Sequence, residues 1–302
     1  MNLRIVNTLA QCVVASLVAM TACSPVPKND APRYVATIPP VAAIAQEIVG
    51  SRGEVITLVP AGASPHTFEL KPSDARAASD AKAVIYAAEE LDGWAARLET
   101  PESIELFALV SEDRRLVIDD HDDHHDHEGH EHHGEADPHF WTHPSIVAAI
   151  APLIANRLTK IDSEYPDAYR NNASRFIREL DKAATDIRTR LEPFNGRAVV
   201  AFHPSMQYLL EREGIEVVGL VAPSPGKETT PQQLRELLDA VKEHDVKVIF
   251  TEPQLPKRAA EVLAEEAGVA LYELDPLGGV PGRMTYFEWL EYNVSVIEEA
   301  LQ

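Results

Sequence analysis

Residues 119–143 hold the densest group of side chains in this chain that could do chemistry. The stretch reads DDHDDHHDHEGHEHHGEADPHFWTH, with nine histidines among acidic residues and no Lys or Arg. Neutral imidazoles and carboxylates bind divalent metal ions, and zinc, copper, nickel and iron all accept imidazole nitrogen. A reference pKa of about 6.5 leaves most histidines unprotonated at neutral pH, as coordination requires. The stretch predicts a metal-handling protein, and a solvated low-complexity loop is the alternative interpretation.

Four residues occupy positions where the ligands of α/β proteins gather, beyond the carboxyl ends of strands or in neighbouring loops. His203 and Asp275 each follow an extended run directly, and His66 lies in the loop after residues 55–59. His139 lies where the histidine-rich stretch meets the next helix. Three imidazoles and one carboxylate, two from each half of the chain, can form a tetrahedral metal site. Taken singly, a histidine at a strand end is often structural, and an Asp before Pro is often a turn or a cap.

Glu252 follows a further extended run, so it is expected near the same site. We expect its carboxylate to accept a hydrogen bond from a ligand imidazole and so to fix the tautomer of that ring, and a helix cap is the alternative role. Glu228, Thr229 and Thr230 precede the helix that begins at Pro231. They are candidates for the rim of the cleft that would hold the metal site, although an ordinary helix N-cap explains them as well.

Alternating extended and helical runs must position these residues. The extended runs expected in the first half are 33–38, 55–59 and 83–88, and its helices are 40–49, 72–81 and 144–158. The second half is expected to have extended runs at 198–202, 216–221, 246–250 and 270–274, and helices at 206–213, 231–244, 256–267 and 285–301. Such alternation is typical of α/β folds with parallel sheets.

A long amphipathic helix is expected between these halves. It begins with Pro166 in its first turn and continues without Gly to about Leu191, or roughly seven turns. Apolar residues recur along it at helical spacing. We therefore predict an α/β fold of two lobes with mainly parallel sheets, joined by one long connecting helix, with the metal site in the interlobe cleft.

The N-terminal residues indicate where the protein works. An apolar run at 12–20 is too short for a transmembrane helix, and Met20-Thr21-Ala22-Cys23 is similar to the lipobox of a bacterial lipoprotein signal. Cleavage before Cys23 would leave its thiol for acylation, and an ordinary secreted protein is the alternative. The predicted division is a signal peptide at 1–22, a Pro-rich tether at 23–32, an N-terminal lobe at 33–160 with a His/Asp-rich loop at 119–136, the connecting helix at 161–194 and a C-terminal lobe at 195–302.

Cysteine usage and charge narrow the possible functions further. The two cysteines, Cys12 and Cys23, lie in the signal peptide and at the lipidation site, so the folded part has neither a disulfide framework nor a thiolate metal site. The formal net charge is -21. Nucleic acid is therefore excluded as a partner, because phosphate binding needs clustered Lys and Arg.

Several motifs together resemble the metal-specific solute-binding proteins of bacterial ABC importers. They are Pro65-His66, Asp-Pro-His-Phe-Trp at 137–141, Ala-Phe-His at 201–203, Phe-Thr-Glu-Pro at 250–253 and Leu-Asp-Pro-Leu-Gly-Gly at 274–279. The resemblance covers nearly the whole mature chain and implies two α/β lobes joined by a long helix. It also implies that the metal ligands are His66, His139, His203 and Asp275. An acidic, histidine-rich insertion before the Asp-Pro-His motif is typical of the zinc members, and here it occupies 119–133.

The expected metal is Zn(II). Manganese and iron members commonly have Glu where this chain has His203, and a third imidazole favours zinc over a carrier of those metals. Cu(I) prefers soft sulfur, which the mature chain offers only at Met206 and Met284. Pro65 stands where some zinc members have Glu, and His143 is an extra histidine without an assigned role.

The resemblance implies a carrier and not an enzyme. The cleft would capture Zn(II) and deliver it to an ABC permease with its ATPase, while acylated Cys23 would hold a monomer at the membrane, in the periplasm or at the cell surface. The loop histidines would collect zinc at low affinity; they are His121, His124, His125, His127, His130, His132 and His133. Two alternatives remain: a zinc hydrolase with Glu252 as its general base, and an envelope zinc buffer or adhesin.

Overall fold

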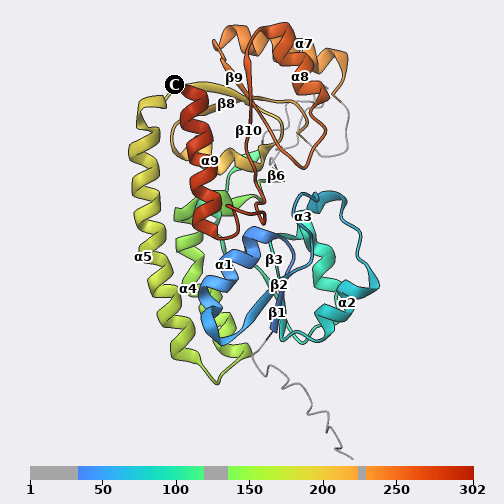
Figure 1. Ribbon diagram of the computed structural model, residues 1–302, viewed down its shortest axis with the longest axis vertical. Coiled ribbons are helices and arrows are strands. Elements are labelled where there is room, and N and C mark those ends of the chain that lie inside the picture. The colour runs from blue at the N-terminus through green and yellow to red at the C-terminus, as the bar shows by residue number, and fades with distance from the viewer. Residues whose placement is uncertain (1–32, 119–134, 224–228) are drawn as a thin grey trace, which may run out of the picture. The chain divides into compact units, whose positions relative to one another are not determined.

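The computed structural model describes residues 33–118, 135–223 and 229–302 (Figure 1). The predicted signal peptide and tether lie outside these residues, and so does Cys23. The seven accessory histidines between positions 121 and 133 and Glu228 also lie outside them. No helix in the described ranges is long and apolar enough to cross a membrane.

A four-stranded parallel sheet organises the first half of the chain. Its order is β2-β1-β3-β4. The strands are β1 (Arg33–Ala36), β2 (Glu54–Thr57), β3 (Ala83–Tyr86) and β4 (Ser103–Glu105). Helices α1 (Pro39–Val49) and α2 (Pro72–Ser79) lie on opposite sides of this sheet (Figure 1). Val41, Ile44 and Ile48 recur at helical spacing and are buried on the inner face of α1.

A second four-stranded parallel sheet organises the second half. Its order is β10-β9-β7-β8. The strands are β7 (Ala198–Ala201), β8 (Glu216–Leu220), β9 (Val248–Thr251) and β10 (Ala270–Glu273). The helices between them are α6 (Gln207–Arg212), α7 (Pro231–Glu243) and α8 (Arg258–Ala267), and α7 packs beside α8. The two sheets confirm the predicted α/β fold with mainly parallel strands.

The long helix α5 (Pro166–Leu191) joins the two halves, as predicted (Figure 1). It buries Phe176, Leu180 and Ile187 on one face and packs against α1 and against α4 (Pro144–Ile161). The C-terminal helix α9 (Tyr286–Leu301) also packs against α5, and it contacts both α1 and β10. A second helix therefore ties the halves together, beyond the single connection predicted.

The sequence patterns missed several short elements. These are α3 (Glu89–Asp92), β4, and the antiparallel hairpin of β5 (Val117–Ile118) and β6 (Glu135–Ala136). Two or three residues are too few to show a recognisable period. The hairpin matters because it forms the base from which the histidine-rich insertion leaves and to which it returns, directly before Asp137.

The two halves share one buried core. Ile85 and Trp141 of the first half belong to the same apolar cluster as Leu209 and Trp289 of the second. Burying such large side chains stabilises the fold by roughly 1.5–3 kcal/mol each. A smaller cluster lies between the second sheet and its helices α7 and α8. The residue boundaries given above for the lobes stay predictions.

Candidate metal centre

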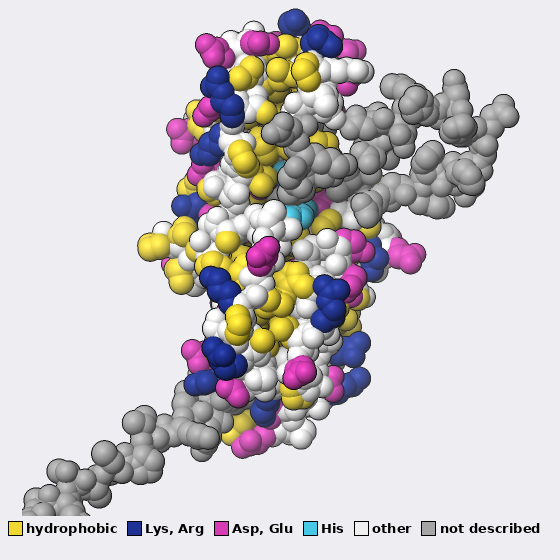
Figure 2. Space-filling model, turned by 90° about the vertical axis from the view of Figure 1, so that its right-hand side faces the viewer, with side chains coloured by type: hydrophobic (Ala, Val, Ile, Leu, Met, Phe, Trp, Pro, Cys, Tyr) yellow, Lys and Arg dark blue, Asp and Glu magenta, His cyan; other side chains and the backbone are white. Residues whose placement is uncertain are grey.

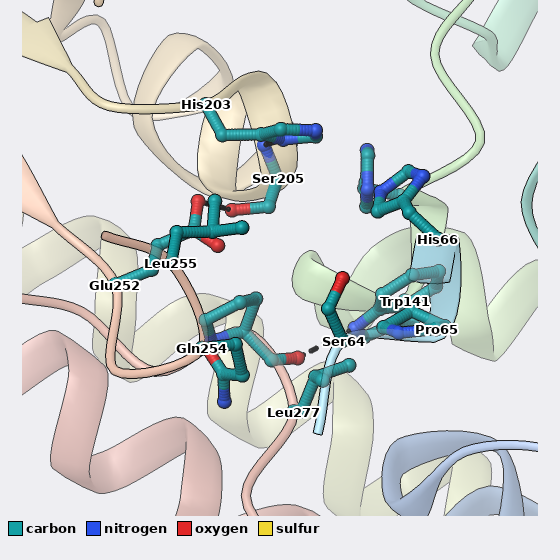
Figure 3. A pocket seen from close by; sticks show the side chains of 12 residues that line it. Ser64, Pro65, His66, Trp141, His203, Ser205, Glu252, Gln254, Leu255 and Leu277 are labelled. Atoms are coloured by element: carbon teal, nitrogen blue, oxygen red, sulfur yellow. Dashed lines mark hydrogen bonds between the residues drawn. The ribbon is translucent and has the colours of Figure 1, made fainter. Parts of the chain in front are cut away.

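Three histidines that are far apart in the sequence meet in one pocket between the two halves. The ring centroids are 5.1 Å apart for His66 and His203, 5.0 Å for His139 and His203, and 5.9 Å for His66 and His139. Each residue offers a nitrogen within 4.8 Å of those of the other two. In Figure 3 the imidazoles of His66 and His203 face each other across the pocket. The structure thus brings together three of the four predicted ligands.

His66 lies at the mouth of this pocket. It belongs to a short 3-10 helix, Pro65–Thr67, in the loop that follows β2. The residue is exposed, whereas His139 and His203 are buried. Even so, desolvation of its ring, with a smaller contribution from His139, lowers the pKa of His66 to about 4. The imidazole is therefore neutral at pH 7 and can coordinate a metal ion.

Asp137 holds the ring of His139. Its Oδ1 accepts hydrogen bonds from the His139 backbone N–H at 2.9 Å and from the ring Nδ1 at 2.6 Å. An ionised carboxylate only accepts, so Nδ1 carries the proton and Nε2 keeps a free lone pair. A carboxylate behind an imidazole in this way is the common arrangement behind a metal-bound histidine.

His203 lies two residues after the end of β7 and caps the short 3-10 helix Pro204–Met206. The backbone N–H of Ser205 donates to its Nδ1 at 3.2 Å, so the neutral ring carries its proton on Nε2. Nε2 is buried without a hydrogen-bond partner in the described part of the chain. Burial, followed by the nearby His139 and His66, holds the pKa of His203 well below its usual value. Coordination through Nε2 requires the other tautomer and so the loss of the bond from Ser205.

Glu252 lines the pocket, but its hydrogen bond goes to a residue other than the one predicted. Its Oε1 accepts from the Ser205 hydroxyl at 2.5 Å, and not from an imidazole. Complete burial raises the pKa of Glu252 to about 8, although the bond from Ser205 opposes this shift. Glu252 therefore acts on His203 only through Ser205, and its side chain is largely protonated at pH 7.

The fourth predicted ligand, Asp275, lies outside the histidine cluster. Its Oδ2 pairs with Arg283 Nη1 at 2.7 Å, and its Oδ1 accepts from the side chain of Gln254 and from the backbone N–H groups of Leu277 and Gly278. Both oxygens are thus occupied by donors from its own loop and from the loop after β9. In the structure Asp275 therefore orders the Leu-Asp-Pro-Leu-Gly-Gly turn and does not join the imidazole cluster, and its role as the fourth ligand stays a prediction.

The remaining predicted residues have structural contacts. His143 caps α4, and its Nε2 lies 3.0 Å from Glu213 Oε1, so the extra histidine belongs to a buried pair away from the cluster. The side chain of Thr230 accepts from the backbone N–H of Gln233 and forms the N-cap of α7, which confirms the cap interpretation. The hydroxyl of Thr229 donates to the carbonyl of Val221.

The pocket has room for one ion. The cavity has a volume of about 20 Å³, which is enough for about one water molecule or metal ion. Trp141 closes one wall, where its Nε1 donates to the Pro276 carbonyl at 3.0 Å (Figure 3). Figure 2, which views the molecule from the right-hand side of Figure 1, shows a small patch of histidine at the surface. The sequence analysis did not identify five further residues that line the pocket, because no local sequence pattern distinguishes them. They are Ser64, Ser205, Gln254, Leu255 and Leu277.

The three rings nearly have the spacing that zinc requires. A tetrahedral ion with Zn–N bonds of about 2.0–2.1 Å sets its nitrogens about 3.4 Å apart, so the rings must approach by at most roughly 1.4 Å. Rotation of side chains can supply this movement. The donor set of three neutral imidazoles suits zinc and is poor in the oxygen that manganese prefers.

This chain is similar to known proteins whose names refer to zinc or to metal binding. The family model described as zinc-uptake complex component A, periplasmic, matches residues 35–300. A putative metal-binding protein of Thermotoga maritima is 31% identical, over 91% of this chain and 94% of the relative. The high-affinity zinc uptake system protein ZnuA of Paracoccus denitrificans is also 31% identical, over 87% of this chain and 90% of the relative.

Solved structures agree with these sequence matches. A Zn(II)-bound variant of AdcAII from Streptococcus pneumoniae superposes with a TM-score of 0.76 and 29% identity, covering 90% of this chain and 98% of the other. The laminin-binding protein Lmb of Streptococcus agalactiae, described as an adhesin with metal-transporting activity, gives a TM-score of 0.75 and 27% identity, covering 90% of this chain and 100% of the other.

Proposed function

The chain belongs to the family of periplasmic zinc-uptake components, as its motifs predict, and on this premise we propose that it is the extracytoplasmic zinc-binding subunit of an ABC importer. The observation that carries the proposal is the cluster of His66, His139 and His203 in a pocket with room for a single ion. Zinc is the cargo, which the protein captures and passes to a membrane permease.

Three protein ligands hold the ion in this proposal. The Asp137 carboxylate orients His139, His203 coordinates through Nε2 once it gives up the bond from Ser205, and His66 closes the site from the mouth of the pocket. Asp275 is the predicted fourth ligand, and it would have to give up its pair with Arg283 to coordinate the ion. The three nitrogen donors favour zinc over the alternative cargoes manganese and iron.

A carrier fits the site better than a hydrolase does. A general base must reach the proton that it removes, whereas the Glu252 carboxyl is buried and already accepts the hydroxyl of Ser205. The pocket also has too little space for an organic substrate beside the ion. We therefore propose that no covalent chemistry takes place, so zinc-loaded protein should not hydrolyse ester or phosphoester model substrates.

The remaining proposals concern the place and partners of the protein. The lipobox-like sequence supports acylation of Cys23 and a monomer anchored at the outer side of a membrane. A permease and its ATPase receive the ion, and the histidine-rich insertion collects zinc at low affinity. A zinc-binding adhesin is the alternative, because one structural neighbour is described as an adhesin. Binding to immobilised laminin would separate that activity from transport.

Competitive titration of the protein from Ser24 onward with Zn(II), Mn(II) and Co(II) tests this function. We expect one tight zinc equivalent that survives deletion of residues 119–134 and disappears in His203→Ala. Loss of all tight binding on deletion of the insertion would instead make the protein a surface collector of zinc. Tighter binding of manganese than of zinc would keep the fold and overturn the cargo.

A further inference from the structure

Tyr208 makes two hydrogen bonds that join segments far apart in the sequence. Its hydroxyl donates to the carbonyl of Asp137 at 3.0 Å and accepts from the backbone N–H of Leu116 at 2.9 Å. Leu116 precedes β5 and Asp137 follows β6, so one phenol closes the base of the hairpin at both ends. The side chain is completely buried, which removes water as a substitute partner for either backbone group.

One of these bonds leads directly to the metal centre. The backbone carbonyl of Asp137 accepts the hydroxyl of Tyr208, and its carboxylate orients the ring of His139. Tyr208 therefore fixes the residue that orients this metal ligand. The other Asp137 oxygen, Oδ2, has no hydrogen-bond partner among the described residues. The position of this carboxylate therefore depends strongly on its backbone.

Tyr208 is also close to His203 along the chain. It lies in the first turn of α6, which begins directly after the 3-10 helix capped by His203. The phenol thus connects the segment that carries His139 to the segment that carries His203. At the other end of α6, Glu213 makes a second connection to the first segment by pairing with His143. His66 belongs to neither segment, and the two hydrogen bonds of Tyr208 do not reach its loop.

We propose that Tyr208 is a positioning residue whose hydroxyl sets the spacing of His139 and His203 and thereby the zinc affinity of the site. This inference rests on the proposed function, since it concerns the same three ligands. A benzyl side chain can fill the same space, but it cannot hold the carbonyl of Asp137. Without that bond, the Asp137 backbone and the ring of His139 are free to move relative to His203.

Tyr208→Phe tests the hydroxyl without opening a cavity. Changes behind a metal ligand typically weaken binding by roughly 10- to 100-fold, and we expect about a 10-fold loss of zinc affinity by competition with a chromophoric chelator. The intensity and position of the visible bands of the Co(II)-loaded protein should also change, because they report the geometry around the ion. A purely structural role would leave these bands unchanged.

Two matched variants separate positioning from general stability. Tyr169 is a fully buried tyrosine that bonds Tyr34 and Asp162 and does not line the pocket, so Tyr169→Phe should lower the thermal stability of the metal-free protein but leave zinc affinity unchanged. Arg212 donates to the carbonyl of Arg114. Arg212→Met therefore loosens the segment that leads into the hairpin and removes the guanidinium over the Tyr208 ring, but it leaves the Tyr208 hydroxyl and Asp137 in place. It should retain wild-type affinity within about two-fold.

The outcomes distinguish this inference from the proposed function. If Tyr208→Phe loses stability as Tyr169→Phe does but retains wild-type zinc affinity and Co(II) bands, Tyr208 is not a positioning residue. Equal losses of affinity in Tyr208→Phe and Arg212→Met would also overturn the inference, because the hairpin would then matter as a whole. If wild-type affinity persists in His203→Ala, the three-histidine site itself is wrong and the proposed function fails.

Discussion

The sequence His-Pro-Ser occurs twice, at 143–145 and 203–205, with the same local geometry. In both, the histidine caps a helical segment that begins at the proline, and the serine N–H donates to the ring Nδ1 at 3.2 Å. The Ser145 hydroxyl also bonds Nδ1 of His143, whereas the Ser205 hydroxyl donates to Glu252. The larger difference lies at the other ring nitrogen. Nε2 of His143 meets Glu213, whereas Nε2 of His203 faces the pocket without a partner.

This comparison shows that the local motif orients a ring and its surroundings decide what the ring does. A buried polar group without a partner costs roughly 1–3 kcal/mol of stability. His143 avoids this cost because its Nε2 bonds the carboxylate of Glu213, so it is a structural residue. His203 retains an open nitrogen beside two other imidazoles, as a ligand must. Substitutions in the two motifs should therefore separate zinc binding from stability.

The largest expected effect is that of His203→Ala on zinc binding. Removing one of three ligands should weaken affinity by more than the roughly 100-fold upper range for changes behind a ligand. The metal-free protein should be affected little, because the lost ring has no partner on Nε2. Isothermal titration or chelator competition measures this effect. Wild-type affinity in His203→Ala would remove the distinction between the two motifs.

His143→Ala should have the opposite signature. It leaves the Glu213 carboxylate buried without its hydrogen-bond donor, which typically costs about 1–3 kcal/mol. Urea unfolding of the metal-free protein should show this loss, while zinc affinity changes far less than in His203→Ala. If zinc binding disappears and stability remains, His143 is the ligand and His203 the structural residue.

Asp137→Asn compares two carboxylates that bond a histidine. Asp137 orients the metal ligand His139, whereas Glu213 stabilises the structural residue His143. The amide can still occupy the same space, but it is a weaker acceptor for the Nδ1–H of His139. Zinc affinity should fall by about 10- to 100-fold. Glu213→Gln is the control, and it should reduce stability more than affinity.

The smallest effect concerns the pH dependence of stability that arises from Glu252. This carboxyl accepts the hydroxyl of Ser205 in the His-Pro-Ser motif at 203–205. Its folded pKa is raised to about 8 from an ordinary unfolded value of about 4.3. Between these values the folded state binds more protons than the unfolded state, so this group lowers stability as pH rises, by at most about 1.4 kcal/mol per pH unit. Urea unfolding of the metal-free protein at pH 5.5 and 7.5 should show a steeper decline for wild type than for Glu252→Gln. Equal slopes would mean that Glu252 is ionised throughout.

Local sequence patterns predicted most of what positions the site. All fourteen expected runs became helices or strands of the same kind, and Pro166 lies in the first turn of the long helix α5 as predicted. His66, His139 and His203 were identified because strand ends and the loops beside them can be recognised from short stretches of sequence. Parallel sheets then bring such positions together at one edge.

Tertiary structure decided which predicted residues became part of the site. Asp275 was predicted as the fourth ligand and His143 had no assigned role, and in the structure one pairs with Arg283 and the other with Glu213, 70 positions away. Glu252 similarly reaches Ser205 across 47 positions. The sequence by itself determined the elements, the three imidazoles and the family, because these follow from local periodicity and motifs. The partner of each polar side chain was decided only by the fold, because burial selects among donors and acceptors that no local pattern brings together.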